Sequence, residues 1–142
     1  MRQEDPLKVL IVEDETLIAI DLEYEITDMG HVVSGTAPDF ATAKRSVIRD
    51  RPDVALMDIR LKNGEDGIDV AQWLREEADV PCIFVSGNLD DKLSERIAPL
   101  EPVACVGKPV LGPLLSDALT QAKTLRDRAL DRFGGFPMPG GT

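Results

Sequence analysis

The feature that most constrains this fold is a short apolar run that ends in an acid, Val54–Asp58. Arg51-Pro52-Asp53 breaks the chain before this run, and the polar segment Lys62–Gly67 can form a loop after it. A run of this length between turn signals is typical of a strand buried on both faces. Open α/β sheets bind ligands at the carboxyl ends of their strands. Asp58 is therefore predicted to lie at such an end, as a metal ligand, a nucleophile or a helix cap.

Apolar runs alternate with amphipathic segments along the rest of the chain. We expect strands at Leu7–Val12, His31–Ala37, Val54–Asp58, Cys82–Val85 and Val103–Val106. A helical pattern follows each strand, beginning after Glu15, at Pro38, at Ile68, at Leu89 and near Val110, and the last helix should end between Arg126 and Arg132. This alternation predicts an α/β fold, with a parallel sheet, right-handed crossovers and helices on both faces.

The periodicity of the helical segments predicts which side chains are buried. These are Ile18, Leu22, Ile26 and Met29 in the first helix, Phe40, Ala43 and Val47 in the second, and Val70, Ala71 and Leu74 in the third, with Trp73 packing beside them. They continue with Leu93 and Ile97 in a weak fourth helix, and with Leu111, Leu114, Leu115, Ala118, Ala122 and Leu125 in the last. Both cysteines, Cys82 and Cys105, lie in apolar runs and are predicted to be buried free thiols. His31 is predicted to be a surface strand residue.

Composition limits the classes of function. With 142 residues, of which 43% are hydrophobic, the chain can form one domain with a real core. Its net charge of −10 argues against non-specific binding to nucleic acid or to an anionic membrane. We find neither an apolar run long enough to span a membrane nor a signal peptide at the N-terminus, and we expect a cytoplasmic protein. The domain should cover residues 1–132, and residues 133–142, rich in glycine and proline, should be a disordered tail.

Polar side chains follow four of the predicted strands. Glu13 and Asp14 follow the first, Asp58 ends the third, Ser86 follows the fourth and Lys108 follows the fifth. In a parallel sheet these ends share one edge, so three carboxylates, a hydroxyl and an ammonium should line one crevice. Carboxylate oxygens suit Mg²⁺, and a carboxylate can attack phosphorus to form an aspartyl-phosphate. Because phosphoryl transfer depends mainly on positioning and charge neutralisation, this set of side chains suits that reaction.

These residues and their order resemble the receiver domain of two-component response regulators, in particular the stand-alone, single-domain type of bacteria. The resemblance covers residues 7–125 and includes Asp66-Gly67 and Lys108-Pro109. It implies a flavodoxin-like (βα)5 three-layer sandwich with the strand order 2-1-3-4-5. It also implies that Asp58 is the phosphoacceptor, and that Ser86 and Lys108 contact the phosphoryl group. Asp14, Asp58 and the backbone carbonyl of Arg60 would bind Mg²⁺ directly, and Glu13 would bind it through water.

The function implied by this resemblance is signalling rather than turnover of a separate substrate. A histidine kinase or histidine phosphotransfer protein would phosphorylate Asp58, and the product would change its affinity for a downstream protein or for a second copy of itself. The sequence departs from the family pattern in three places. Glu13 stands where many receivers have aspartate, the long cation Arg60 lies beside the site, and Cys105 stands where an aromatic residue is common.

Three other functions remain open from the sequence. The chain could be a phosphate sink that drains a kinase, or a pseudo-receiver that binds partners without being phosphorylated; the intact acid cluster and Lys108 argue against the second. The third is a phosphatase of the haloacid dehalogenase type. That class requires a second acid two residues after the nucleophile, and here this position is Arg60.

Overall fold

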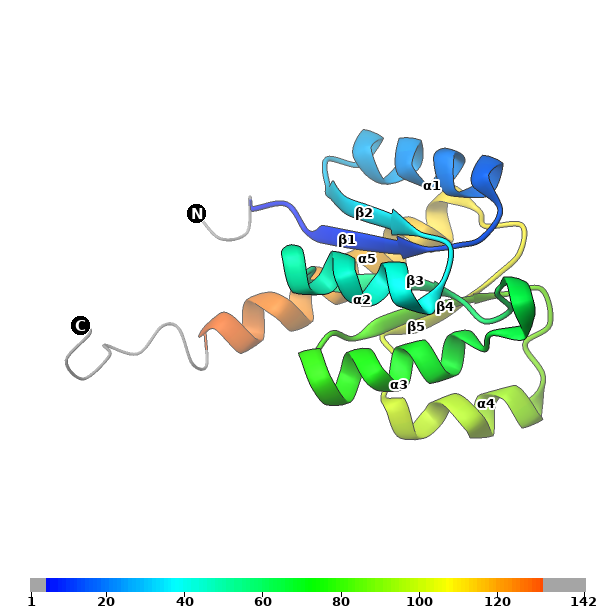
Figure 1. The fold of residues 1–142 in the computed structure, drawn as a ribbon. Coiled ribbons are helices and arrows are strands. Elements are labelled where there is room, and N and C mark those ends of the chain that lie inside the picture. The colour runs from blue at the N-terminus through cyan, green and yellow to red at the C-terminus, as the bar shows by residue number, and fades with distance from the viewer. Residues whose placement is uncertain (1–4, 132–142) are drawn as a thin grey trace.

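The structure, a computed structural model that describes residues 5–131, contains all five predicted strands. They are β1 (Lys8–Val12), β2 (Val32–Ala37), β3 (Val54–Asp58), β4 (Cys82–Ser86) and β5 (Ala104–Gly107). Every neighbouring pair is parallel, and the order across the sheet is β2-β1-β3-β4-β5 (Figure 1). This confirms the predicted order and the flavodoxin-like fold. The predicted tail at 133–142 lies outside the described residues.

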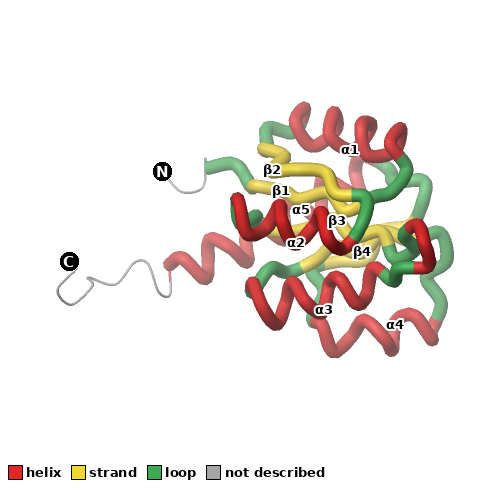
Figure 2. The backbone as a smooth tube through the Cα atoms, in the orientation of Figure 1, coloured by secondary structure: helices red, strands yellow, loops and turns green. Residues whose placement is uncertain are grey.

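Helices cover both faces of the sheet. Their bounds are α1 (Thr16–Asp28), α2 (Phe40–Arg49), α3 (Gly67–Ala78), α4 (Asp91–Ile97) and α5 (Gly112–Ala129), with short 3-10 turns at Lys62–Gly64 and Ala98–Leu100. In Figure 2, α2 and α3 lie in front of the strands and α5 behind them. One buried cluster joins the sheet to α1 and α5, and another joins it to α2, α3 and the end of α4. Among residues 5–131, no helix combines the length and apolar character of a membrane span.

The central strand β3 is buried along its whole length, as predicted. Leu56 packs into the cluster with α1 and α5, whereas Met57 packs into the cluster with α2 and α3. This alternation follows from the strand geometry, in which successive side chains point to opposite faces. The strand therefore has no solvent-facing side, and its last residue, Asp58, is held at the edge of the sheet where the loops begin.

The predicted buried face of α5 is partly wrong. Leu115, Ala118 and Ala122 are buried as predicted, and so is Leu119, which the prediction omitted. By contrast Leu111, Leu114 and Leu125 are 55%, 49% and 50% exposed. The buried positions have the spacing i, i+3, i+4, i+7, which is the narrow stripe that one helix presents to a flat sheet. The wider stripe read from the sequence included leucines on the flanks of this face.

The prediction for the cysteines is confirmed for Cys82, which is buried, and wrong for Cys105, which is exposed. Cys105 lies on the edge strand β5, opposite Phe84 in the register of the sheet. Phe84 belongs to the cluster under α2 and α3. On that side of the sheet α4 has only seven residues, of which Ile97 alone is buried, and Cys105 stays exposed.

His31 is not the surface strand residue that the sequence predicted. Strand β2 begins one residue later, and His31 is partly buried in the loop before it. Its Nδ1 accepts a hydrogen bond of 3.1 Å from the backbone N–H of Leu7. Burial lowers the pKa of His31, and the nearby cations Lys123 and Arg126 lower it further.

Acidification is therefore expected to destabilise the wild-type protein more than a His31→Asn variant. The unfolded chain takes up a proton on His31 near the ordinary pKa of about 6.5, and the folded protein does so only at lower pH. Stability that depends on neutral His31 is thus complete above that pH and is lost as the pH falls through the folded pKa. Asparagine can still accept the bond from Leu7 but does not titrate. Urea unfolding of both proteins across this range measures the difference, and parallel pH profiles would contradict the prediction.

Candidate functional site

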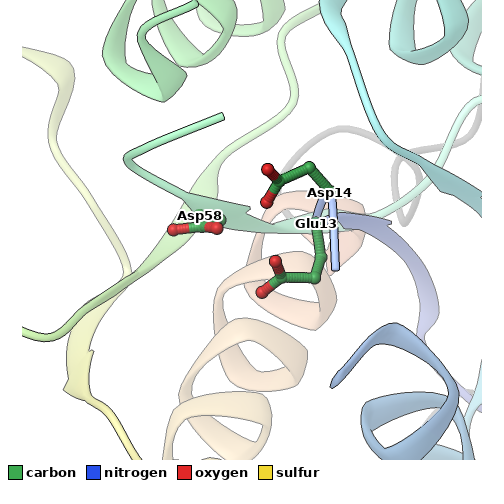
Figure 3. A group of neighbouring side chains, drawn as sticks. All are labelled: Glu13, Asp14 and Asp58. Atoms are coloured by element: carbon green, nitrogen blue, oxygen red, sulfur yellow. The ribbon is translucent and has the colours of Figure 1, made fainter. Parts of the chain in front are cut away.

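Three acidic side chains meet where β1 and β3 end (Figure 3). Glu13 and Asp14 follow β1, and Asp58 is the last residue of β3. Each contributes a carboxylate oxygen to a group whose members lie within 4.8 Å of one another. Strands β1 and β3 are parallel neighbours, with Val12 paired to Met57, so the residues that follow them are necessarily adjacent. The structure thus brings together the three carboxylates that the sequence predicted at this edge.

Glu13 and Asp58 are the buried members of the cluster, with exposed fractions of 4% and 5%. One Glu13 oxygen accepts a hydrogen bond of 3.1 Å from the backbone N–H of Glu15. Asp58 Oδ1 accepts a bond of 3.3 Å from the backbone N–H of Arg60. Burial, together with the nearby Asp58 carboxylate, raises the pKa of Glu13 to about 7. Near neutral pH, the carboxylates of Glu13 and Asp58 therefore need a nearby positive charge to offset their repulsion.

Lys108 supplies part of that charge. Its Nζ lies 3.3 Å from Asp58 Oδ1 and 3.6 Å from Glu13 Oε1. Burial alone would lower the pKa of Lys108, but the carboxylates of Asp58 and Glu13 outweigh it and raise the pKa. The lysine is placed by the backbone of its strand end, where its N–H donates a hydrogen bond of 2.9 Å to the Ser86 carbonyl. It is thus a charged, positioned donor beside Asp58.

Ser86 lines the same crevice, but its hydroxyl is engaged locally. The oxygen accepts a hydrogen bond of 3.1 Å from the backbone N–H of Asn88 and lies 3.3 Å from the Asn88 carbonyl oxygen, to which it can donate. These are turn contacts within the loop after β4.

The crevice above the acids has a volume of about 630 Å³. Its lining includes Asp14, Asp58, Arg60, Ser86, Lys92, Arg96 and Lys108. The structure therefore places every predicted site residue except the deeper Glu13 on one surface. Lys92 and Arg96 are additions to the predicted set. They come from the weak helix α4, which the sequence predicted without assigning any of its polar residues to the site.

The backbone around Asp58 is packed unusually closely. The N–H of Gly67 donates a hydrogen bond of 2.7 Å to the Ile59 carbonyl. A Cβ on Gly67 would overlap the Asp58 carbonyl oxygen and lie only 2.9 Å from Ile59 Cα. Residue 67 must therefore be glycine for α3 to begin where it does. The sequence pattern identifies Asp66-Gly67 as a motif. The need for glycine at residue 67 becomes clear only from the fold, which packs this residue against the Asp58 backbone.

The acid cluster fits a divalent cation of the Mg²⁺ type. Octahedral ligands about 2.1 Å from Mg²⁺ lie about 3 to 4 Å from one another, which is compatible with oxygens grouped within 4.8 Å. All three donors are carboxylates, the ligand class that a hard cation prefers. A cation here would also offset the like charges of Glu13 and Asp58, which Lys108 alone does not balance.

Comparison with known proteins gives a consistent family assignment. The family model described as the response regulator receiver domain matches residues 9–120. The chain is 32% identical over 126 residues to the phyllosphere-induced regulator PhyR of Methylorubrum extorquens, a match that covers 88% of this chain and 46% of PhyR. It is 31% identical over 104 residues to the transcriptional regulatory protein PdtaR of Mycobacterium tuberculosis, covering 73% of this chain and 50% of PdtaR. The chain thus spans about half the length of these relatives.

Solved structures agree with this assignment. The signal receiver domain of a modulated diguanylate cyclase from Desulfovibrio desulfuricans superposes with a TM-score of 0.80 at 30% identity. That match covers 88% of this chain and 99% of the receiver domain. The similarity in fold therefore extends over most of this chain.

Proposed function

This chain belongs to the response regulator receiver domain family, and we propose that it accepts a phosphoryl group on Asp58 from a histidine kinase or a histidine phosphotransfer protein. The observation that carries the proposal is the placement of Asp58. The residue is 5% exposed, and its carboxylate lies 3.3 Å from Lys108 Nζ and belongs to the three-acid cluster. Of the three acids, only Asp58 is both paired with Lys108 and part of the crevice lining.

The proposed reaction is a displacement at phosphorus. An Asp58 oxygen forms a bond to phosphorus, and the bond to the donor nitrogen breaks, with its electron pair leaving on the donor. Lys108 remains beside Asp58 and pairs with a phosphoryl oxygen, and the Ser86 hydroxyl donates a hydrogen bond to another. Asp14, Asp58 and the Arg60 carbonyl would hold Mg²⁺ directly, and Glu13 would hold it through water. When bound, this cation would neutralise charge on the phosphoryl group.

The proposed consequence is signalling by protein–protein interaction. The phosphoryl group carries a charge of about −1.5 to −2 at neutral pH, by analogy with other phosphorylated side chains. Because it replaces the single negative charge of the Asp58 carboxylate, the net change is roughly −0.5 to −1. We propose that this charge changes the affinity of the chain for a downstream protein or for a second copy, in the cytoplasm. No turnover of a separate substrate is proposed.

Incubation with a small phosphodonor and Mg²⁺ is expected to add one phosphoryl mass to the wild-type protein and none to Asp58→Asn. Intact-mass spectrometry measures this directly. Asp69→Asn, which changes an exposed acid in the first turn of α3, is the matched control and should be modified like wild type. An increment that persists in Asp58→Asn would disprove the assignment. An unmodified wild-type protein would favour the non-phosphorylated pseudo-receiver.

Transmission from the site is expected to depend on Ser86 and not on Cys105. An exposed cysteine has one side-chain torsion and only a weak hydrogen-bonding group, so it cannot replace the motion of an aromatic ring. In Cys105→Ala, phosphorylation should still change amide exchange between Gly87 and Ala98, whereas Ser86→Ala should reduce the change by about tenfold, or 1.4 kcal/mol of coupling. Loss of the response in Cys105→Ala with an intact response in Ser86→Ala would contradict this prediction.

A further inference from the structure

Helix α4 is weakly held against the rest of the domain. It has seven residues, of which only Ile97 is buried, and Leu93 packs partly against the core. The segment after it is fixed from α3, because Arg75 donates hydrogen bonds of 3.2 Å to the Leu100 carbonyl and 2.9 Å to the Glu101 carbonyl. The far end of α4, toward the crevice, therefore depends on few contacts.

The last turn of α4, next to the buried Ile97, makes an ion pair with the start of α3. Arg96 Nη2 lies 2.7 Å from Asp66 Oδ2. The other oxygen of the same carboxylate, Oδ1, accepts a hydrogen bond of 2.8 Å from the Ile68 N–H and so caps α3. Asp66 is thus fixed to α3 by one oxygen and holds α4 with the other.

Asp66 is also connected to the phosphoacceptor. Residue 66 pairs with Arg60 in an isolated antiparallel bridge, two residues beyond Asp58. The next residue, Gly67, is packed against the Asp58 backbone. Arg96 itself lines the crevice that contains Asp58 and Lys108. Arg96 therefore pairs with the Asp66 carboxylate and also lines the crevice that contains Asp58.

We propose that the Asp66–Arg96 ion pair is a latch that holds α4 in the unphosphorylated protein, and that the phosphoryl charge on Asp58 opens it. This proposal rests on the proposed function of Asp58. A guanidinium matches the geometry of phosphate oxygens, and phosphorylation adds the stronger anion to the crevice. Asp66 cannot follow Arg96, because its other oxygen remains in the α3 cap. When Arg96 turns toward the phosphoryl group, α4 loses its ion pair with the start of α3 and keeps only its apolar contacts through Leu93 and Ile97.

The exposure of the pair suits a latch. The side chains of Arg96 and Asp66 are 54% and 30% exposed, and exposed ion pairs contribute little to stability. A contact of this strength can be exchanged without unfolding the domain, yet it can bias the position of a helix that has one buried residue. Elements that move are drawn from the least stable parts of a structure.

The first experiment uses the unphosphorylated protein and measures amide exchange in α4. Asp66→Asn keeps an oxygen that can cap α3 but removes the charge, and Arg96→Gln removes the partner. Each is expected to raise exchange over residues 91–97 by about two- to fivefold, and the double variant should add nothing further. Lys92→Gln is the matched control, since it removes a cation from the same helix and crevice. If Arg96→Gln raised exchange no more than Lys92→Gln, the latch would not exist.

The second experiment repeats the measurement after phosphorylation, with the mass increment recorded for each sample. Phosphorylated wild type and phosphorylated Asp66→Asn are expected to exchange equally in α4, because the latch is already open. If Asp66→Asn raised exchange as much after phosphorylation as before it, the ion pair would persist in the phosphorylated protein. That result would overturn the proposed latch and leave the proposed function of Asp58 intact. If the wild-type protein showed no phosphoryl mass increment, the proposed function of Asp58 would be overturned, and the proposed opening of the latch would be overturned with it.

Discussion

Replacing Gly67 with alanine is expected to destabilise the protein by about 1–3 kcal/mol or more, the range seen when atoms are forced into a packed interior. The added Cβ would overlap the Asp58 carbonyl oxygen, and Ile59 Cα lies 2.9 Å from it. These are backbone atoms at the end of a buried strand, so no side-chain rotation can relieve the overlap. Either α3 or the end of β3 must shift.

The same substitution should also slow phosphorylation of Asp58, because the strand end that moves is the one that positions its carboxylate. Urea unfolding and the rate of mass increment with a small phosphodonor measure the two effects. Gly87→Ala is the control, since a Cβ at that glycine of the same crevice meets nothing within 4 Å. If Gly67→Ala matched Gly87→Ala in both measurements, the close approach of α3 to β3 would not matter.

The fold and most of the site could be predicted from the sequence because a polar or charged site residue ends or follows four of the five strands. The run before Asp58 is short, apolar and bounded by turn residues, and the structure buries all of it. Once the alternation of strands and helices predicted a parallel sheet, residues after different strands had to share an edge. The meeting of Glu13, Asp14 and Asp58 follows from that topology, although their roles remain predictions.

Features set by neighbours distant in sequence could not be predicted. Cys105 has the same apolar context as Cys82, but Cys105 lies on the edge strand β5 and is exposed. His31 is polar and precedes a strand, yet it is partly buried and accepts a hydrogen bond from the backbone N–H of Leu7, 24 residues away. The pairing of Asp66 with Arg96 spans 30 residues. Periodicity reports which face of an element is apolar and contains no information about such partners.

Magnesium is expected to raise the melting temperature more at about pH 8 than at about pH 6. A cation that binds only the folded state stabilises it by about 2.7 kcal/mol at a hundredfold excess over its dissociation constant. The effect should depend on pH because the cation competes with a proton for the acid cluster, and the proton in question is on Glu13.

The sign follows from the raised pKa of Glu13, about 7 in the metal-free protein against an ordinary value of 4.5. The folded protein holds this proton more tightly than the unfolded chain does. Glu13 therefore contributes stability that is complete below the ordinary pKa and is lost as the pH rises through about 7. Above that pH the metal-free protein carries crowded carboxylates, and a bound cation removes their repulsion.

Two variants separate the charges that produce this effect. Asp58→Asn should raise the melting temperature in metal-free buffer, because it removes one of the like charges beside Glu13. Glu13→Gln should remove most of the difference between the magnesium effects at the two pH values, because its amide does not titrate. Thermal unfolding with chelator and with Mg²⁺, at both pH values, measures each of these. Identical wild-type curves with chelator and with Mg²⁺ would rule out a magnesium site, and an unchanged pH effect in Glu13→Gln would assign the proton to another group.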